Sequence, residues 1–237
     1  MQKIKLFPDT NAFLFFELEG YTTIVYTIER NNKLYIIDTF MGSDYMELIL
    51  QDDNELLEYI IINTHFHYDH IFGNAAFENN KIYAHQKCYD LINETREVAL
   101  NDYGKQLKGK QELLLPNHLF DQEVVFETDD IILQHTPGHS IDSISIYDRQ
   151  NKAIYTGDNL EKPIIQICNV DRVTYSNTLQ SYLSYKDYRY FASHTLELTR
   201  DDIQQMIDYL MNMEDYSFTD QTLNKIHIYN LELSSKK

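Results

Sequence analysis

Residues 61–74, IINTHFHYDHIFGN, place three histidines and an aspartate directly after an apolar run. That run, residues 57–64 (LEYIIINT), has the composition of a strand buried on both faces. In an extended chain residues i and i+2 face one side, so His65 and His67 can aim at one point, as can Asp69 if the extension continues. His70 breaks the alternation and faces a neighbouring point. Such clusters are costly unless paired or metal-bound, so the pattern predicts a metal site rather than a histidine-rich surface turn.

Further ligands are expected from distant segments, because an ion held by His65 and His67 needs at least one more. A second ion could use Asp69 and His70. Three later residues share the position just after an apolar run, where binding groups concentrate on loops. They are His139 in LQHTPGHS (133–140), Asp158 in AIYTGDNL (153–160) and His194 in YRYFASHT (188–195).

Two strand-rich portions organise the chain, each followed by helical patterns. Strands are expected at 12–18, 22–28, 33–38, 57–64 and 81–85, then at 123–128, 131–136, 143–148, 152–158 and 188–193. Helices are expected at 43–51 with Ser43 as the N-cap, at 74–79, within 86–112, and at 176–186 and 200–213. This order of strands and helices predicts two packed sheets with helices outside, in one domain over residues 1–237.

Charge and cysteine content restrict the possible partners and compartment. The formal net charge of −17 argues against nucleic acid or an anionic membrane as a partner. It also disfavours strongly anionic substrates unless bound metal reverses the local sign. Cys88 and Cys168 form no CxxC pair, which favours the reducing cytoplasm. The segment 8–11 (PDTN) interrupts any apolar signal region, and no apolar run approaches the roughly 20 residues of a membrane helix.

The ordered motifs HxHxDH (65–70), TPGHS (136–140), TGD (156–158) and a late histidine resemble the metallo-β-lactamase superfamily over roughly residues 10–210. The resemblance implies an α/β (α+β) fold, the αββα four-layer sandwich, with the active site at one edge between the sheets. It also implies two divalent metal ions, Zn²⁺ first, with Fe or Mn as alternatives. The ligands carried over are His65, His67 and His139 for one ion, Asp69, His70 and His194 for the other, and Asp158 as the bridge. The late motif reads ASHTL where many relatives read GHG, which indicates a different local loop.

The activity implied is that of a binuclear metallohydrolase acting on a small molecule. A hydroxide between the ions attacks a carbonyl or phosphoryl centre, and Asp69 is the catalytic residue that holds the nucleophile. A small ester, thioester or lactone is the favoured substrate, with a phosphodiester next. A mononuclear iron oxidoreductase resembling a persulfide dioxygenase is the alternative on this scaffold. True β-lactamases of the family lack an aspartate at the position of Asp158, which disfavours that activity. The oligomeric state stays open.

The other histidines are interpreted as structural. His135 precedes the Pro-Gly turn on a strand, and His85 ends another strand. His118 is expected in a surface loop, and His227 lies far from the motifs. Asp38 has two interpretations: it accepts a hydrogen bond from a ligand histidine, or it caps a turn.

Two further regions border the predicted site. Tyr175 and Tyr103 are candidate oxyanion donors, although packing is the favoured interpretation for each. The polar segment 86–120 is expected to form a cap that carries substrate specificity. Its leucines at 107 and 113–115 are expected to pack against the mouth of the site.

Overall fold

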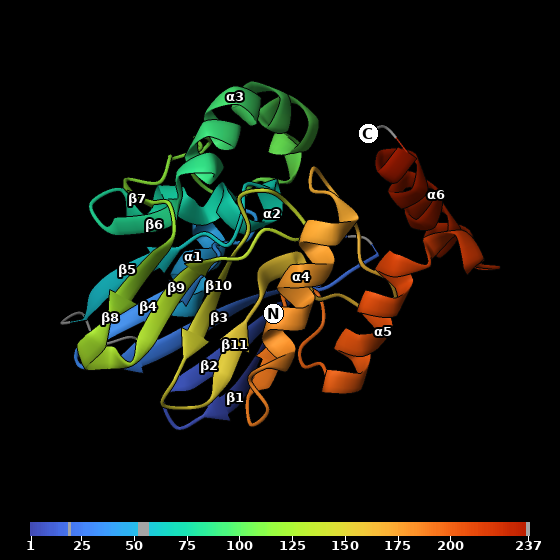
Figure 1. The fold of residues 1–237 in the computed structure, drawn as a ribbon. Helices are drawn as coiled ribbons and strands as arrows, with labels where there is room; N and C mark the ends of the chain where they lie inside the picture. Colours follow the sequence, from blue (N-terminus) through green and yellow to red (C-terminus); the bar gives the residue numbers. More distant parts are fainter. Residues whose placement is uncertain (19, 52–56, 236–237) are drawn as a thin grey trace.

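Two β-sheets stacked face to face form the centre of the protein, and helices cover the outer face of each sheet (Figure 1). The computed structural model describes residues 1–18, 20–51 and 57–235. One apolar core lies between the sheets, and one further core lies between each sheet and its helices. This is the predicted αββα four-layer sandwich, so the predicted fold is confirmed.

The first sheet has the strand order β1-β2-β3-β4-β5-β6-β7. Its first four strands pair antiparallel, and β4 to β7 pair in parallel. Parallel neighbours require crossover connections, and these carry the helices of this half. The strands are β1 (Gln2–Phe7), β2 (Thr10–Phe15), β3 (Thr23–Arg30), β4 (Lys33–Ile37), β5 (Glu58–Ile62), β6 (Lys81–His85) and β7 (His118–Phe120).

The second sheet has the strand order β12-β11-β10-β9-β8. Its strands pair antiparallel except for the parallel pair of β11 and β12. A helix, α4, lies in the crossover between that parallel pair. The strands are β8 (Glu123–Phe126), β9 (Ile131–His135), β10 (Ile144–Asp148), β11 (Ala153–Tyr155) and β12 (Arg189–Phe191).

In the described part of the chain, six α-helices form the outer layers. Those against the first sheet are α1 (Ser43–Leu50), α2 (Tyr68–Ile71) and α3 (Gln86–Tyr103), and those against the second are α4 (Arg172–Leu183), α5 (Arg200–Met211) and α6 (Gln221–Ser235). Short 3₁₀ helices are η1 (Phe72–Phe77), η2 (Gly104–Gln106), η3 (Glu127–Asp129), η4 (Gly157–Asn159) and η5 (Met213–Asp215). Within the described residues, no helix combines the length and apolar character needed to span a bilayer.

The central strands are apolar on both faces because each face packs into a different core. In β5, Ile60 and Ile62 lie in the core between the sheets, whereas Ile61 faces the helices of the first sheet. Alternation of side chains along a strand produces this division. The apolar run before the histidine cluster is therefore a strand buried on both faces, as predicted.

Arg30 joins the two sheets at the end of β3. Its guanidinium donates to both carboxylate oxygens of Asp148 on β10, at 3.0 and 3.1 Å. It also donates to Asp9 Oδ2 at 2.5 Å and to the backbone oxygen of Asp129 at 2.6 Å. Asp148 is fully buried, so this charge is tolerable only because it is paired and hydrogen-bonded.

Several local predictions were wrong. Gly42, not Ser43, is the N-cap of α1, and the Ser43 hydroxyl instead accepts a hydrogen bond from Lys110 N at 2.9 Å. His118 lies on the edge strand β7 rather than in a loop, although its side chain is exposed as expected. Three elements, the strands β1 and β7 and the helix α6, were not predicted from sequence patterns. β7 has only three residues, too few to show an alternating pattern.

His85 and His135 stack on each other, with ring centroids 3.8 Å apart. His85 caps α3 by accepting a hydrogen bond from Lys87 N through Nδ1, and its Nε2 donates to Asp121 O at 2.9 Å. Both nitrogens of the neutral ring are therefore used. Burial first, and then the neighbouring His135, lower the pKa of His85 from 6.5 to about 4. The structural interpretation of both histidines fits these contacts.

We expect His85→Asn to weaken the loss of stability in acid. Because the pKa of His85 is lowered in the folded state, its contribution to the free energy of unfolding is intact above pH 6.5. That contribution declines as the pH falls toward 4, because over this range His85 binds a proton in the unfolded chain but not in the folded protein. The free energy of unfolding lost in this way is about 3 kcal/mol at most. Asparagine keeps the cap without titrating. Urea unfolding at pH 7 and pH 4.5 measures the difference, with the exposed His118→Asn as the control. An unchanged pH dependence in His85→Asn would contradict this assignment.

Candidate metal centre

The predicted ligands lie on loops and short helices that follow strands of both sheets. His65 and His67 follow β5, while Asp69 and His70 lie on α2. The remaining three come from the second sheet. They are His139 after β9, Asp158 on η4 after β11 and His194 after β12. The fold therefore brings segments far apart in the sequence to one edge of the sandwich.

The backbone turns into a helix immediately after His67. His67 has extended φ and ψ angles of −65° and 146° and is the N-cap of α2, which begins at Tyr68. The extension that would have carried Asp69 to the same point as His65 and His67 therefore does not continue beyond His67. The helical turn instead directs Asp69 and His70 to a second point.

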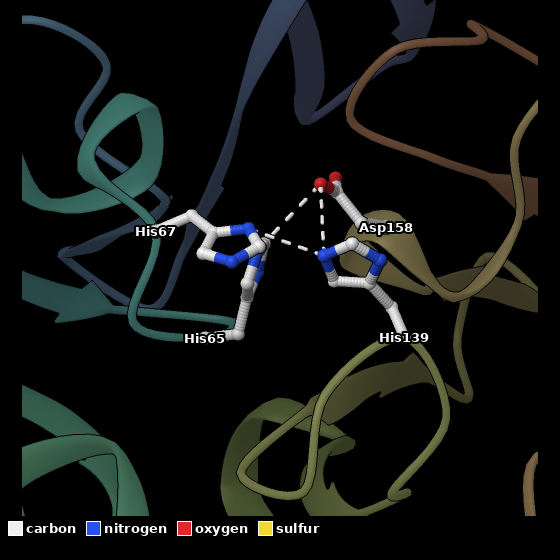
Figure 2. Close-up of side chains that lie close together, drawn as sticks. All are labelled: His65, His67, His139 and Asp158. Atoms are coloured by element: carbon white, nitrogen blue, oxygen red, sulfur yellow. Dashed lines mark hydrogen bonds and ion pairs between the residues drawn. The ribbon is translucent and has the colours of Figure 1, made fainter. Parts of the chain in front are cut away.

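A first ligand group consists of His65, His67, His139 and Asp158, whose candidate ligand atoms all lie within 4.8 Å of one another. Figure 2 shows His65 and His67 opposite His139 and Asp158. His139 Nε2 is 3.1 Å from His67 Nδ1 and 3.9 Å from Asp158 Oδ2, and His65 Nε2 is 3.5 Å from the same oxygen.

A second ligand group consists of Asp69, His70 and His194, again with ligand atoms within 4.8 Å. Asp69 Oδ2 is 3.5 Å from His70 Nε2 and 3.6 Å from His194 Nε2. Asp158 lies between the two groups, because its oxygens are also 3.4 Å from His70 Nε2 and 3.3 Å from His194 Nε2. The structure thus brings together all seven residues named from the sequence, in the two sets that the family resemblance implies.

Hydrogen bonds fix the ring orientation of four of these histidines. Each donates its Nδ1–H to an oxygen, which leaves Nε2 as the free ligand atom. The acceptors are Thr64 Oγ1 for His65 (3.1 Å), Asp38 Oδ2 for His70 (2.8 Å), Gln166 O for His139 (2.7 Å) and Thr22 O for His194 (2.8 Å).

His67 has the reverse orientation. Its Nδ1 faces His139, and its Nε2 lies 3.7 Å from Cys168 Sγ. Cys168 was not expected to contact the site, because a lone cysteine far from the histidine motifs gives no spacing signal. It is a free thiol, as is the buried Cys88.

Asp38 satisfies both of its predicted roles. Its carboxylate accepts the Nδ1–H of His70, and it also caps the chain turn by accepting Thr64 N–H at 2.7 Å and the Thr64 hydroxyl at 2.8 Å. Since the Thr64 hydroxyl donates to Asp38, its oxygen accepts from His65 Nδ1–H. One buried carboxylate therefore orients a histidine of each ligand group.

The residues present fit divalent metal ions. His65 Nε2, His70 Nε2 and Asp158 Oδ1 are buried and have no hydrogen-bond partner among the described residues. Buried polar atoms left unpaired cost about 1–3 kcal/mol each, so such atoms need a function. Imidazole nitrogens combined with carboxylate oxygens are the donor set of zinc and similar metals.

The electrostatics favour neutral imidazoles in the first group and an ionised Asp158. Burial, then the neighbouring histidines, hold the pKa values of His65 and His67 well below the usual range. Burial opposes the charged form of Asp158, but the surrounding histidines, His194 first, hold its pKa well below the usual range. Neutral imidazole and ionised carboxylate are the protonation states that bind metal.

Tyr175 and His227 are both buried. The Tyr175 hydroxyl is buried and donates to Asn159 O at 3.0 Å, so the suggestion that it stabilises an oxyanion is wrong and the packing interpretation holds. His227 is buried on α6 and pairs with Tyr209 Oη at 3.0 Å, apart from both ligand groups.

A cleft of about 770 Å³ opens in front of both groups. His67, Asp69, His139, Asp158 and His194 line it. Segment 86–120 lines the cleft through one face of α3, within residues 95–103, and Tyr103 belongs to this face. The leucines at 107 and 113–115 do not line the cleft, so that detail of the prediction is wrong. Leu107 lies in the core between the first sheet and its helices, and the leucines at 113–115 pack against that core.

Comparison with known proteins identifies the class. The sequence model of the metallo-beta-lactamase superfamily matches residues 20–194, a span that contains all seven predicted ligands. The chain belongs to this superfamily, and its fold and candidate metal site are those of a metal-dependent hydrolase.

Individual relatives are distant. A probable metallo-hydrolase from Methanocaldococcus jannaschii is 28% identical over 108 residues, which cover 46% of this chain and 41% of the relative, so the match spans less than half of that relative's length. The metallo-beta-lactamase structure from Pontibacter korlensis has a TM-score of 0.71 at 14% identity and covers 89% of this chain and 99% of its own. That from Erythrobacter litoralis has a TM-score of 0.71 at 14% identity, covering 88% and 95%. At these identities the structural likeness shows the fold alone.

We expect Asp38→Asn to lower metal affinity about 10- to 100-fold. The Asp38 carboxylate accepts hydrogen bonds from both His70 and Thr64. An uncharged amide accepts these hydrogen bonds more weakly, so histidines of both groups lose their orientation. Competition with a chromophoric chelator measures the affinity, and the exposed Asp187→Asn is the matched control. Equal affinities of the two variants would show that Asp38 does not orient the ligands.

Proposed function

We propose that the protein is a binuclear metallohydrolase that cleaves a small ester, thioester or lactone. The observation that supports this most directly is the position of Asp158, whose carboxylate approaches histidines of both ligand groups within 3.3–3.9 Å. A purely structural zinc site is normally closed and tetrahedral. Here the two groups border an open cleft whose volume of about 770 Å³ suits a small substrate.

Each ligand group would hold one ion, and Asp158 would be shared between them. When bound, divalent ions of this kind polarise a substrate oxygen and lower the pKa of a coordinated water. Zn²⁺ is the metal that the histidine-rich set favours, with Fe or Mn as alternatives.

Asp69 is the proposed catalytic residue of the chain itself. It lines the cleft, and the Thr23 hydroxyl donates to its Oδ2 at 3.3 Å, which restrains the carboxylate. A carboxylate in this position can accept the proton of the attacking water and return it to the leaving group. Phe66 and Tyr68, on either side of His67 in the sequence, line the same cleft.

Carbon esters are favoured over phosphodiesters because of charge. The protein carries a net charge of −17, which repels a phosphodiester more than a neutral acyl compound. The cleft walls also include apolar side chains, Val98 and Ala99 from α3 and Leu223 and Ile226 from α6. We infer a cytoplasmic location from the two free thiols, which suit a reducing compartment.

Carefully metal-loaded protein should hold two ions per chain. His194→Ala removes a ligand of the second group only, so it should retain one ion, while the exposed His118→Ala should retain two. Inductively coupled plasma mass spectrometry after gel filtration gives the content. Wild-type protein that never exceeds one ion, or that is isolated with iron alone, would favour a mononuclear iron oxidoreductase instead.

Asp158→Ala should lower turnover of thioester, ester or lactone substrates by about 100-fold or more, because it removes the carboxylate that both groups share. The fold should persist, since Asp158 lies on the short 3₁₀ helix η4, outside the strands of both sheets. Circular dichroism checks the fold and a substrate screen on the zinc-loaded protein gives the rate. Asp187→Ala, an exposed aspartate, should match wild type. Full activity of Asp158→Ala would rule out a shared carboxylate.

A further inference from the structure

The cleft in front of the ligand groups has walls that the metal motifs do not supply. These walls come from the loop before β3, from α3, from the loop after η4 and from α6. If the proposed function holds, these walls contact the part of the substrate beyond the scissile bond. Their charges and shapes therefore indicate which substrate the cleft accepts.

The walls are acidic. Glu161, three residues after Asp158, and Asp102, at the rim on α3, both line the cleft. Lys162 is the sole lysine or arginine among the described residues that line it, and its Nζ lies 2.6 Å from Asp202 Oδ1. That cation is already paired, so the walls offer no free positive side chain to a substrate carboxylate or phosphate.

Glu161 is the carboxylate best placed to bind a substrate group. It is partly buried, lines the cleft beside the ligand groups and makes no hydrogen bond or salt bridge with the described residues. A partly buried carboxylate without a partner is costly, and a cationic ligand would relieve that cost.

Three tyrosines form a connected aromatic wall in the same cleft. Tyr21 Oη is 2.9 Å from Tyr68 Oη, and the Tyr68 and Tyr103 rings stack with centroids 3.7 Å apart. All three line the cleft, and Tyr21 and Tyr103 are each 36% exposed, so they are accessible to a ligand. Aromatic walls attract organic cations, and quaternary ammonium groups are ligands that proteins commonly bind in this way.

We infer that the cleft selects a substrate that carries an organic cation, such as an alkylammonium group, next to the ester, thioester or lactone. Glu161 pairs with the cation, and the tyrosine wall of Tyr21, Tyr68 and Tyr103 packs against its alkyl groups. The net charge of −17 adds a long-range attraction for cationic ligands. The inference rests on the proposed function only in taking this cleft as the substrate site.

The test compares choline with 3,3-dimethylbutan-1-ol, which has the same shape but no charge. Isothermal titration calorimetry on the full-length, zinc-loaded protein should show choline binding about ten-fold tighter or more. Glu161→Gln should weaken choline binding about ten-fold and leave the affinity for the alcohol unchanged. Tyr68→Leu should weaken choline binding as well, through loss of the aromatic face. The exposed Glu123→Gln on β8 is the matched control and should bind both ligands as wild type does.

Metal content is measured for every variant. Equal affinity for the two ligands, or choline affinity unchanged in Glu161→Gln, would overturn the inference. So would loss of metal from Glu161→Gln, because Glu161 would then serve the ligand groups rather than the substrate. A protein that binds choline through Glu161 but hydrolyses no ester, thioester or lactone would contradict the proposed function alone. Hydrolysis with no preference for acetylthiocholine over the uncharged 3,3-dimethylbutyl thioacetate would contradict the inference alone.

Discussion

The buried carboxylate of Asp38 is the interaction on which the candidate centre depends. It lies just after β4 with a left-handed φ of 63°, a conformation that aspartate tolerates better than most residues. There it accepts hydrogen bonds from Thr64 and His70 and, at 3.4 Å, from Ser193, the neighbour of His194. Three segments that carry ligands thus meet at one anion. The arrangement orients the imidazoles before any ion binds, which reduces the reorganisation that binding requires.

Close backbone contact between the two sheets completes this edge. Gly157 adopts a φ of 57°, and a Cβ added there would lie 2.9 Å from the Thr64 side chain. Glycine is therefore required where the Asp158 loop crosses the loop that precedes His65. Backbone hydrogen bonds hold each of these segments against the second sheet, from Ile144 N at the start of β10 to Thr64 O and from Ser193 N after β12 to Gly157 O. Arg30 links the sheets at the other end of β3, so both ends of the interface between the sheets are fixed by polar contacts around an apolar middle.

Chemistry and selectivity are separated within the molecule. The ligand groups lie on loops that follow the strands of the two sheets, a framework that this chain shares with distant metallo-beta-lactamases. The cleft walls come instead from α3, α6 and the loops before β3 and after η4. Such a division lets one fold act on different substrates, because the walls can change without moving the ligands. In this chain the walls include the acidic Asp102 and Glu161 and the aromatic Tyr21, Tyr68 and Tyr103.

The sequence by itself determined the fold and the composition of the candidate site, because both are encoded locally. Strand patterns such as that of residues 57–64 follow from burial on two faces, and the HxHxDH, TPGHS and TGD motifs mark strand ends that converge at one edge. Only the tertiary structure decided which ring nitrogen faces the centre, that Cys168 lies beside His67, and that Glu161 and Tyr21 line the cleft. These features depend on contacts between residues up to about 170 positions apart, such as His194 with Thr22. No local pattern encodes such contacts, since they arise from how the loops pack once the sheets have stacked.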